Sequence, residues 1–322
     1  MIKTVKPGLL TTVQDEGRWG YQAYGMPVAG AMDRYAYRVA NLLAANRKGA
    51  PVLEMTMLGG AFEFQKKYLV SVCGADMQPT LDGTRVPNWS AFYVPAGGVL
   101  SFDYVLAGCR TYLAVHGGIK VPLVLGSQST YTRAHVGGME GRPLKEGDLL
   151  YGSSDGRLGG VPRVLPEHFV PRYDQEIRLR VIMGPQDDMF TAEGIKTFLE
   201  GKYTVSNEAD RMGYRLEGPK IKHADKADII SDALPEGAVQ VPAHGMPIVM
   251  LADRQTTGGY AKIATVIGPD LSLLAQGRPG DTVCFCACTD KEALDLLRSE
   301  EQRYLDLQRL FEEEQFFTCM ES

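Results

Sequence analysis

The chain has 322 residues, of which 44% are hydrophobic and 23% are charged, and its net charge at pH 7 is -5. This composition is typical of a globular protein, and it excludes intrinsic disorder and a core of membrane-spanning helices. The scattered basic residues form no charged run that fits a nucleic-acid backbone, so we expect neither a nucleic-acid partner nor a membrane partner.

The N-terminal residues MIKTVKPGLL lack the charged and apolar regions of a secretory leader, and we therefore expect a cytoplasmic protein. Beyond them, 36 glycines and 18 prolines separate short apolar runs such as KYLVSVCGA, TYLAVHGG and IRLRVIMGP. Short β-rich runs bounded by turn residues predict a mainly β protein of barrel or sandwich type.

Three segments interrupt this pattern with helical spacing. Asp33 is a candidate N-cap for a helix that extends to about residue 46, and a shorter helix is predicted over 191–199. A third helix is predicted to begin at Thr289, with Glu292 in the reciprocal position of a capping box. Its apolar residues at near-helical spacing favour packing against the rest of the protein over a role as an interface helix.

The cysteines suggest no disulfide scaffold. Cys284, Cys286 and Cys288 alternate along one predicted strand, so their side chains should share one face. We expect them to be reduced and packed in the core, because no CxxC pair or neighbouring histidine offers metal-ligand spacing. The sequence predicts no metal site.

The two halves of the chain resemble each other weakly. Residues 14–21 are similar to 208–214, and residues 144–151 are similar to 277–285. We therefore predict a first β-barrel domain over 1–160, a second over 161–288, and a C-terminal helix and tail over 289–322.

Four polar clusters stand next to glycine, where the backbone can approach a ligand closely. They cover residues 11–20, 25–33, 116–131 and 252–260. Arginine beside such a backbone can grip a carboxylate or phosphate, which suits an anionic or amide-bearing small molecule. The alternative is that each Asp-Arg pair only pins a loop.

Several common reaction templates are absent. No phosphate loop of the Walker type occurs, and Ser127 and Ser129 lack the flanking residues of a hydrolase nucleophile elbow. His116 and His244 adjoin glycine and are possible acids or bases, although loop histidines held by hydrogen bonds are the more common case.

The clusters together resemble one family. The runs TTVQDEGRWGYQAYGMPVAGAMD, AVHGGIKVPLVLGSQSTY, GPQDDMF, ADRMGYRLEG and VPAHGMPIVMLADRQTTGGYAKIATVI occur in this order. They are similar to the allophanate hydrolase subunit 2 family, also called the biotin-dependent carboxyltransferase or KipA family, over residues 7–285. Gln128 stands where members commonly have arginine, and His244 replaces a small polar residue.

This resemblance implies two cyclophilin-like β-barrel domains and a protein that works with partners. They are a KipI-like subunit 1 protein, the B-type component of a 5-oxoprolinase, and a LamB/YcsF-like protein, the A-type component. The assembled complex is expected to use ATP and Mg, with no cofactor bound covalently to this chain. The expected function is that of a 5-oxoprolinase component acting on 5-oxo-L-proline, a lactam. The alternatives are a KipA-like regulatory antagonist of a kinase inhibitor, and a carboxyltransferase or allophanate hydrolase component of urea degradation.

The resemblance also directs attention to particular side chains. Arg18 or Arg254 is a candidate for holding the substrate carboxylate, and Asp15 and Asp253 are candidates for a base or for arginine-orienting groups. Backbone N-H groups near Gly258 and Gly259 are candidates for stabilising developing charge. The predicted substrate-binding residues are Gln14, His116, Gln255, Thr256, Thr257, Gly258, Gly259 and Tyr260.

Overall fold

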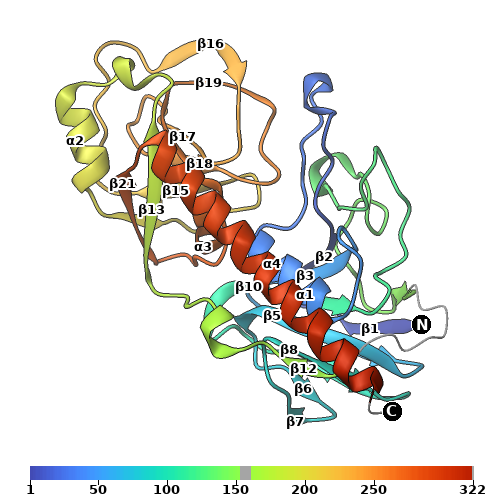
Figure 1. The fold of residues 1–322 in the computed structure, drawn as a ribbon. Coiled ribbons are helices and arrows are strands. Elements are labelled where there is room, and N and C mark those ends of the chain that lie inside the picture. The colour runs from blue at the N-terminus through green and yellow to red at the C-terminus, as the bar shows by residue number, and fades with distance from the viewer. Residues whose placement is uncertain (153–160, 321–322) are drawn as a thin grey trace. The chain divides into compact units, whose positions relative to one another are not determined.

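The computed structural model describes residues 1–152 and 161–320, except for the side chains of 313–320 (Figure 1). The chain divides into two compact units, each formed from segments that are distant in sequence. Unit 1 contains Met1–Gly17, Asp33–Tyr173 and Glu301–Ser322, and unit 2 contains Arg18–Met32 and Asp174–Glu300. The predicted domain boundary between residues 160 and 161 lies at the edge of the described residues.

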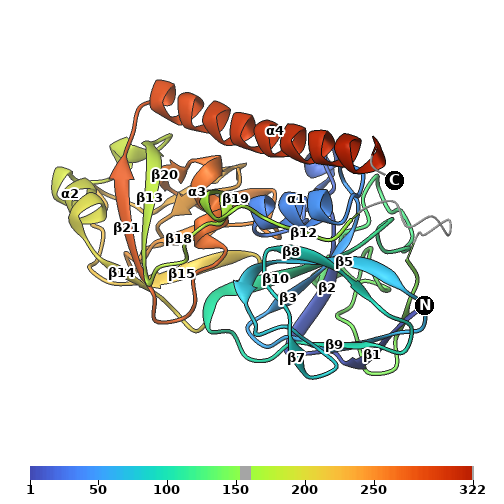
Figure 2. The same cartoon turned by 60° about the horizontal axis from the view of Figure 1, so that its bottom comes forward.

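Unit 1 consists mainly of two six-stranded antiparallel sheets. The first has the order β11 (Leu149–Leu150), β1 (Ile2–Lys6), β4 (Ala61–Phe64), β9 (Val99–Ser101), β6 (Thr80–Leu81) and β7 (Thr84–Arg85). The second has the order β12 (Arg163–Val164), β8 (Ser90–Val94), β5 (Tyr68–Asp76), β10 (Ala107–Val115), β3 (Val52–Thr56) and β2 (Leu10–Gln14). Strand β5 is buried over nearly its whole length because α1 (Arg34–Leu43) covers it (Figure 2).

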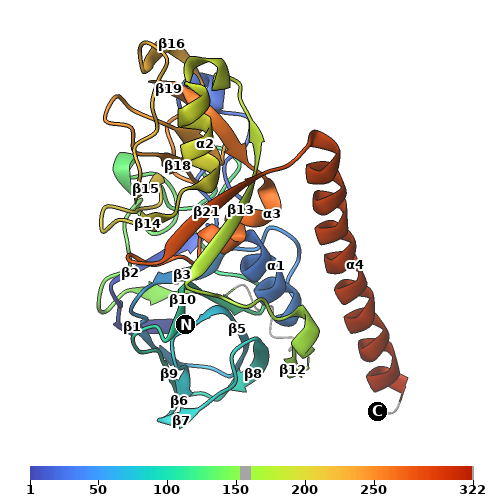
Figure 3. The same cartoon turned by 90° about the vertical axis from the view of Figure 1, so that its left-hand side faces the viewer.

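Unit 2 contains a closed seven-stranded barrel, which confirms the mainly β prediction. Around the barrel the strands are β13 (Glu176–Met183), β20 (Lys262–Val266), β17 (Ala238–Gln240), β18 (Ile248–Met250), β15 (Gly213–Glu217), β14 (Tyr203–Val205) and β21 (Thr282–Ala287). Strands β13 and β21 run parallel, side by side, and the other pairs are antiparallel (Figure 3).

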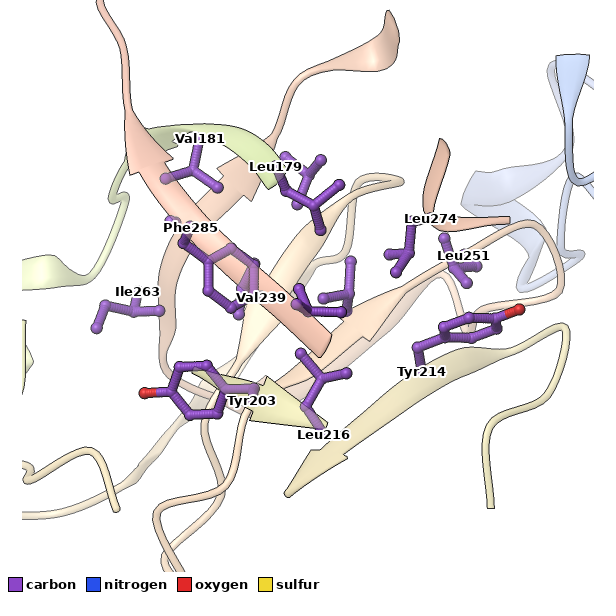
Figure 4. Close-up of a cluster of buried hydrophobic side chains, with 14 of the residues drawn as sticks. Leu179, Val181, Tyr203, Tyr214, Leu216, Val239, Leu251, Ile263, Leu274 and Phe285 are labelled. Atoms are coloured by element: carbon purple, nitrogen blue, oxygen red, sulfur yellow. The ribbon is translucent and has the colours of Figure 1, made fainter. Parts of the chain in front are cut away.

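Apolar side chains from these strands fill the barrel (Figure 4). Leu179, Val239 and Ile263 are fully buried there, and the ring of Phe285 stacks on Phe198 of α2 (Ala192–Glu200) at 4.4 Å between ring centroids. This packing fixes β21 with its even-numbered residues turned away from the core. Cys286 is consequently exposed, while Cys284 and Cys288 are half-buried. Cys284 and Cys286 alternate along β21 as predicted, Cys288 follows the end of the strand, and the expectation of core thiols was wrong for these three cysteines.

A separate two-stranded sheet pairs β16 (Asp228–Ala233) with β19 (Thr257–Tyr260) in unit 2, and we call this pair the arm (Figure 1). Most residues of β16 are exposed, and Ile230 is 94% exposed. Strand β19 leads through Ala261 directly into β20 of the barrel. The arm is therefore accessible, whereas β20, the next strand in the chain, is buried in the barrel.

The predicted helix starts are confirmed. The Asp33 carboxylate accepts a hydrogen bond from the backbone N-H of Ala36 at 2.9 Å, and the Thr191 hydroxyl caps α2. Thr289 and Glu292 form the reciprocal capping box of α4 (Asp290–Met320). The remaining helices are α3 (Gly268–Leu274), η1 (Gln22–Tyr24), η2 (Thr132–Ala134), η3 (Glu167–Phe169) and η4 (Asp187–Met189).

The part of α4 that belongs to unit 1 packs against that unit, as predicted. Leu307 and Phe311 are buried, and the guanidinium of Arg38 forms two hydrogen bonds with Glu301 and lies 3.8 Å from the ring centroid of Tyr304. Within residues 1–152 and 161–320, none of the helices combines the length and the apolar composition that a bilayer crossing requires.

Candidate functional site

In unit 1, the Asp15 carboxylate joins the end of β2 to the loop 127–129. It accepts hydrogen bonds from the Ser127 hydroxyl at 2.7 Å, the Ser129 hydroxyl, the Gln128 backbone N-H at 2.6 Å and the Gly17 backbone N-H at 2.8 Å. Both carboxylate oxygens are engaged by protein donors. This geometry favours a structural role for Asp15, which pins the serine loop, over proton abstraction from a substrate.

Two other predicted residues of unit 1 are also engaged with the protein. The Gln14 amide is fully buried and donates to the Thr12 hydroxyl at 2.9 Å and to the Thr130 carbonyl at 3.2 Å. A ring nitrogen of His116 lies 2.8 Å from the Ala44 carbonyl oxygen. The preferred interpretation of His116 as a hydrogen-bonded loop histidine agrees with this contact.

In unit 2, a buried ion pair connects two of the polar motifs. The Arg211 guanidinium grips the Asp253 carboxylate with two hydrogen bonds of 3.0 and 2.9 Å, and both residues are less than a tenth exposed. Arg211 also donates to the Gly30 carbonyl at 2.6 Å, and the backbone of Ala29 donates to that of Ala252 at 3.0 Å. Three motifs that are far apart in sequence, 25–33, 208–214 and 252–260, thus meet at one ion pair.

Asp253 therefore orients an arginine, but that arginine is Arg211 and not the adjacent Arg254. The Arg254 guanidinium donates to the carbonyl oxygens of Leu234 at 3.0 Å and Leu251 at 3.1 Å, and the residue is 7% exposed. Arg18 is fully buried. These positions favour the loop-pinning alternative for Arg254 and make direct contact between Arg18 and a ligand difficult.

The rest of the 252–260 motif is accessible, because it forms strand β19 of the arm. Gln255 and Thr257 are exposed, Tyr260 is 42% exposed, and Thr256, Gly258 and Gly259 are half-buried. Gly258 faces an amide: a Cβ atom built there would lie 2.5 Å from Nε2 of Gln240. A larger residue at this position would have to displace the end of the Gln240 side chain, which gives one of the two glycines a physical reason.

A cluster that sequence reasoning missed joins the arm to the barrel, and it is formed by Gln186, Asp232, Gln240 and Lys262. Lys262 is 1% exposed, and its Nζ atom lies 2.7 Å from Oδ2 of Asp232 and 3.1 Å from the Ala233 carbonyl oxygen. The Asp232 side chain, by contrast, is 52% exposed. The hydrogen bond from Lys262 lowers the pKa of the Asp232 carboxyl, with further help from the backbone N-H of Ala233.

Two glutamine amides complete this Lys262 cluster. The Gln186 side-chain oxygen accepts from the Lys262 backbone N-H at 3.1 Å, and the Gln186 side chain makes a small further contribution to the lowered pKa of the Asp232 carboxyl. Gln240 pairs with Lys262 in the barrel register and donates to the Tyr260 carbonyl at 3.3 Å. An ammonium beside primary amides is a donor set that suits a carboxylate or an amide oxygen.

The sequence contains only part of the information that was needed to find this cluster. Gln186 lies in the run GPQDDMF and Lys262 follows GGY in the last run, so both are inside the motifs that carry the family resemblance. Nothing in the local sequence indicates that the lysine is buried, because its burial depends on the pairing of β20 with β17.

Unit 2 also has a shallow hollow of about 570 Å³ beside α2. Lys220, Lys222, His223 and His244 are among its lining residues. His223 is held by the Val241 carbonyl at 2.9 Å, and the ring of His244 accepts from the Met246 backbone N-H at 3.2 Å. Among the described side chains, no group of three or more His, Cys, Asp or Glu residues is arranged to hold a metal ion.

Comparison with known proteins places this architecture in a family. The model of the family "Carboxyltransferase domain, subdomain A and B" matches residues 24–287. The C-type component of 5-oxoprolinase from Escherichia coli is 38% identical over 312 residues, which cover 95% of this chain and 97% of that protein. Urea amidolyase from Saccharomyces cerevisiae is 33% identical over 317 residues, which cover 93% of this chain but 17% of that protein.

A solved structure gives the same result for the fold. The urea carboxylase of Kluyveromyces lactis superposes with a TM-score of 0.91 at 30% sequence identity, over 95% of this chain and 29% of that one. The match to the family model spans both units of the structure. The chain belongs to the family of carboxyltransferase domains with subdomains A and B.

Proposed function

We propose that this chain is one component of an ATP-dependent 5-oxoprolinase, which cleaves 5-oxo-L-proline to L-glutamate together with two partner proteins. The observation that carries the proposal is the extent of the similarity to the Escherichia coli 5-oxoprolinase component, which covers 97% of that protein. In the yeast urea amidolyase the similar region is 17% of a much longer chain. A match from end to end supports a shared role better than a match to one part of a larger enzyme.

The proposed partners are a KipI-like subunit 1 protein and a LamB/YcsF-like protein, and the assembled complex uses ATP with Mg. The chain contains no Walker phosphate loop, so standard Walker geometry in this chain does not support ATP use. The proposed location is the cytoplasm, where ATP is abundant.

The reaction sets two demands on the protein. A lactam without ring strain is stabilised by resonance, and coupling to ATP activates it through phosphorylation of the amide oxygen before water attacks. The complex must therefore hold the substrate carboxylate and stabilise the negative charge that develops on the activated amide. In this chain the accessible arm and the Lys262 cluster supply hydrogen-bond donors, whereas Asp15 and Arg254 are engaged in pinning loops.

Reconstitution tests the proposal directly. The chain is combined with its purified KipI-like and LamB/YcsF-like partners, assembly is verified by size-exclusion chromatography, and glutamate release from 5-oxo-L-proline is measured with and without ATP. We expect release only from the three-chain mixture with ATP. If the three chains assemble into a tight complex that releases no glutamate, the oxoprolinase proposal is wrong. The KipA-like regulatory alternative then gains support.

A carboxyltransferase role is the second candidate, and two observations favour it. The family model carries that description, and the fold superposes on a urea carboxylase with a TM-score of 0.91. The 322 residues include no biotin-attachment segment, so the test of this activity supplies carboxybiotin separately. Transfer of labelled carboxylate from carboxybiotin to urea, in a mixture containing a separate biotin carboxylase, distinguishes this role from lactam hydrolysis.

A further inference from the structure

The two residues of the ion pair between Lys262 and Asp232 differ strongly in solvent exposure. The lysine is 1% exposed, while the side chain of Asp232, which is 2.7 Å away, is 52% exposed. A buried ammonium is costly unless a counter-charge and hydrogen-bond acceptors accompany it. The barrel thus depends on an accessible carboxylate to neutralise one of its buried charges.

That carboxylate comes from a largely exposed strand of unit 2. Asp232 lies on β16, whose only strand partner in the described chain is β19, and most residues of β16 are exposed. A two-stranded sheet with little apolar burial is marginally stable, and such segments open locally at small free-energy cost. The counter-ion is therefore held by a largely exposed strand, which contacts the barrel core through the partly buried side chain of Ile229.

On the barrel side, the groups around the Asp232 carboxylate already form a site that holds a carboxylate. We call this site, formed by Lys262 and Gln186, the cradle. The Asp232 carboxylate is bound by the ammonium of Lys262 at 2.7 Å, and the side chain of Gln186, whose oxygen accepts from the Lys262 backbone N-H, makes a smaller contribution to the lowered pKa of that carboxyl. The Lys262 ammonium also bonds to the Ala233 carbonyl, beside Asp232 on the same strand. Each of these barrel-side donors can serve the carboxylate of another molecule in the same way.

We infer that the cradle formed by Lys262 and Gln186 is a binding site for small carboxylates, that Asp232 is its resident internal ligand, and that a bound carboxylate replaces Asp232 and releases β16. Under the proposed function, this site holds the carboxylate of 5-oxo-L-proline or L-glutamate. The binding itself requires neither ATP nor a partner and is measured on the isolated chain, so its failure is distinct from failure of the oxoprolinase reaction.

Chemical rescue provides the main test, with acetate and formate as probes against chloride at the same ionic strength. Asp232→Ala leaves Lys262 without its counter-ion, so we expect a lowered Tm that rises saturably with acetate. The double variant Asp232→Ala, Lys262→Met should not respond to acetate. Asp76→Ala removes a similar short ion pair of 2.6 Å with the exposed Arg85, and it serves as the matched control without rescue.

The affinity difference gives a second readout. In the wild type Asp232 competes for the cradle, so we expect acetate to bind Asp232→Ala at least about tenfold more tightly than the wild type. If Asp232→Ala does not fold, Asp232→Asn takes its place. Equal responses of the Asp232 variant to acetate and chloride would overturn the inference.

Hydrogen exchange tests the release of β16 in the unmodified chain. Saturating L-glutamate or 5-oxo-L-proline should accelerate amide exchange in residues 228–233 of the wild type and leave a Lys262→Met variant unchanged. Slower exchange, or no change, in the wild type would contradict the replacement of Asp232. The two proposals can fail separately. If acetate rescues the isolated Asp232 variant but the three-chain mixture is inactive, the carboxylate site is supported and only the oxoprolinase proposal is rejected.

Discussion

The ion pair between Arg211 and Asp253 offers the sharpest test of whether the polar motifs of unit 2 stabilise the fold or serve a chemical role. Asp253→Asn changes no heavy-atom shape, but it leaves the guanidinium of Arg211 charged and about nine-tenths buried. Removing one partner of a buried ion pair typically costs about 3 to 5 kcal/mol. We expect about 3 kcal/mol, the lower end, because the asparagine oxygen still accepts one of the two hydrogen bonds.

The loss of unfolding free energy can be measured for unit 2 alone, because each unit contains one of the two tryptophans. Trp19 belongs to unit 2 and Trp89 to unit 1, so a Trp89→Phe background leaves Trp19 as the fluorescence probe of unit 2. Urea unfolding in that background gives the free energy of unfolding of the unit that contains the ion pair. A companion Arg211→Met, Asp253→Leu variant removes both charges and should recover most of the lost stability.

The matched control is Glu208→Gln. Glu208 lies 3.5 Å from Arg215 in the same unit, but its side chain is 77% exposed, and exposed pairs contribute less than about 1 kcal/mol. If Asp253→Asn is no more destabilising than Glu208→Gln, the motifs of unit 2 are not held together by this pair. Asp253 would then again be a candidate for a chemical role.

Three further outcomes follow from the described contacts. Gly258→Ala places a methyl group against the Gln240 amide and should cost about 1 to 3 kcal/mol of unfolding free energy, whereas Gly259→Ala, whose nearest contact is at 3.7 Å, should stay within about 0.5 kcal/mol; thermal melts of both variants compare them. The Arg38 guanidinium holds the pKa of the Glu301 carboxyl below its usual value, so its contribution to the docking of α4 is present above the unfolded pKa near 4.5 and is lost as the pH falls through the lower folded value. Amide exchange of residues 301–311 should therefore be faster at pH 3 than at pH 5 after correction for intrinsic rates, and Glu301→Gln should abolish that difference. Cys286 is exposed while Cys73 and Cys109 are buried, so brief alkylation of the native protein followed by peptide mass spectrometry should find the label at Cys286 and not at the other two.

Local patterns in the sequence were sufficient for the mainly β class and for the starts of three of the four α-helices in the described chain, but they missed α3 and placed the end of α1 near residue 46 rather than at Leu43. Asp33, Thr191 and the pair Thr289 and Glu292 marked helix starts correctly, because a capping side chain bonds to backbone N-H groups within three residues of itself. The mainly β class followed equally from short apolar runs between turn residues. The cysteines of β21 show the limit, since alternation predicts that they share a face but not which face is covered.

The candidate site depended on contacts that local patterns do not contain. Sequence proximity suggested that Asp253 acts with Arg254, yet the barrel turns Arg254 toward two backbone carbonyls and brings Arg211, 42 positions away, to Asp253. Lys262 gave no signal of its own, because a lysine at the start of a strand is usually solvated.

The amino-acid sequence by itself determined the class of the fold, the starts of three helices and the motifs that carry the family resemblance, because these depend on interactions between near neighbours. Only the tertiary structure decided which charges pair, which arginine is engaged with backbone carbonyls, and that a buried lysine takes its counter-ion from an exposed strand. The physical reason is that the cost of burying a charge depends on every group around it, and those groups come from strands that the folded barrel alone brings together.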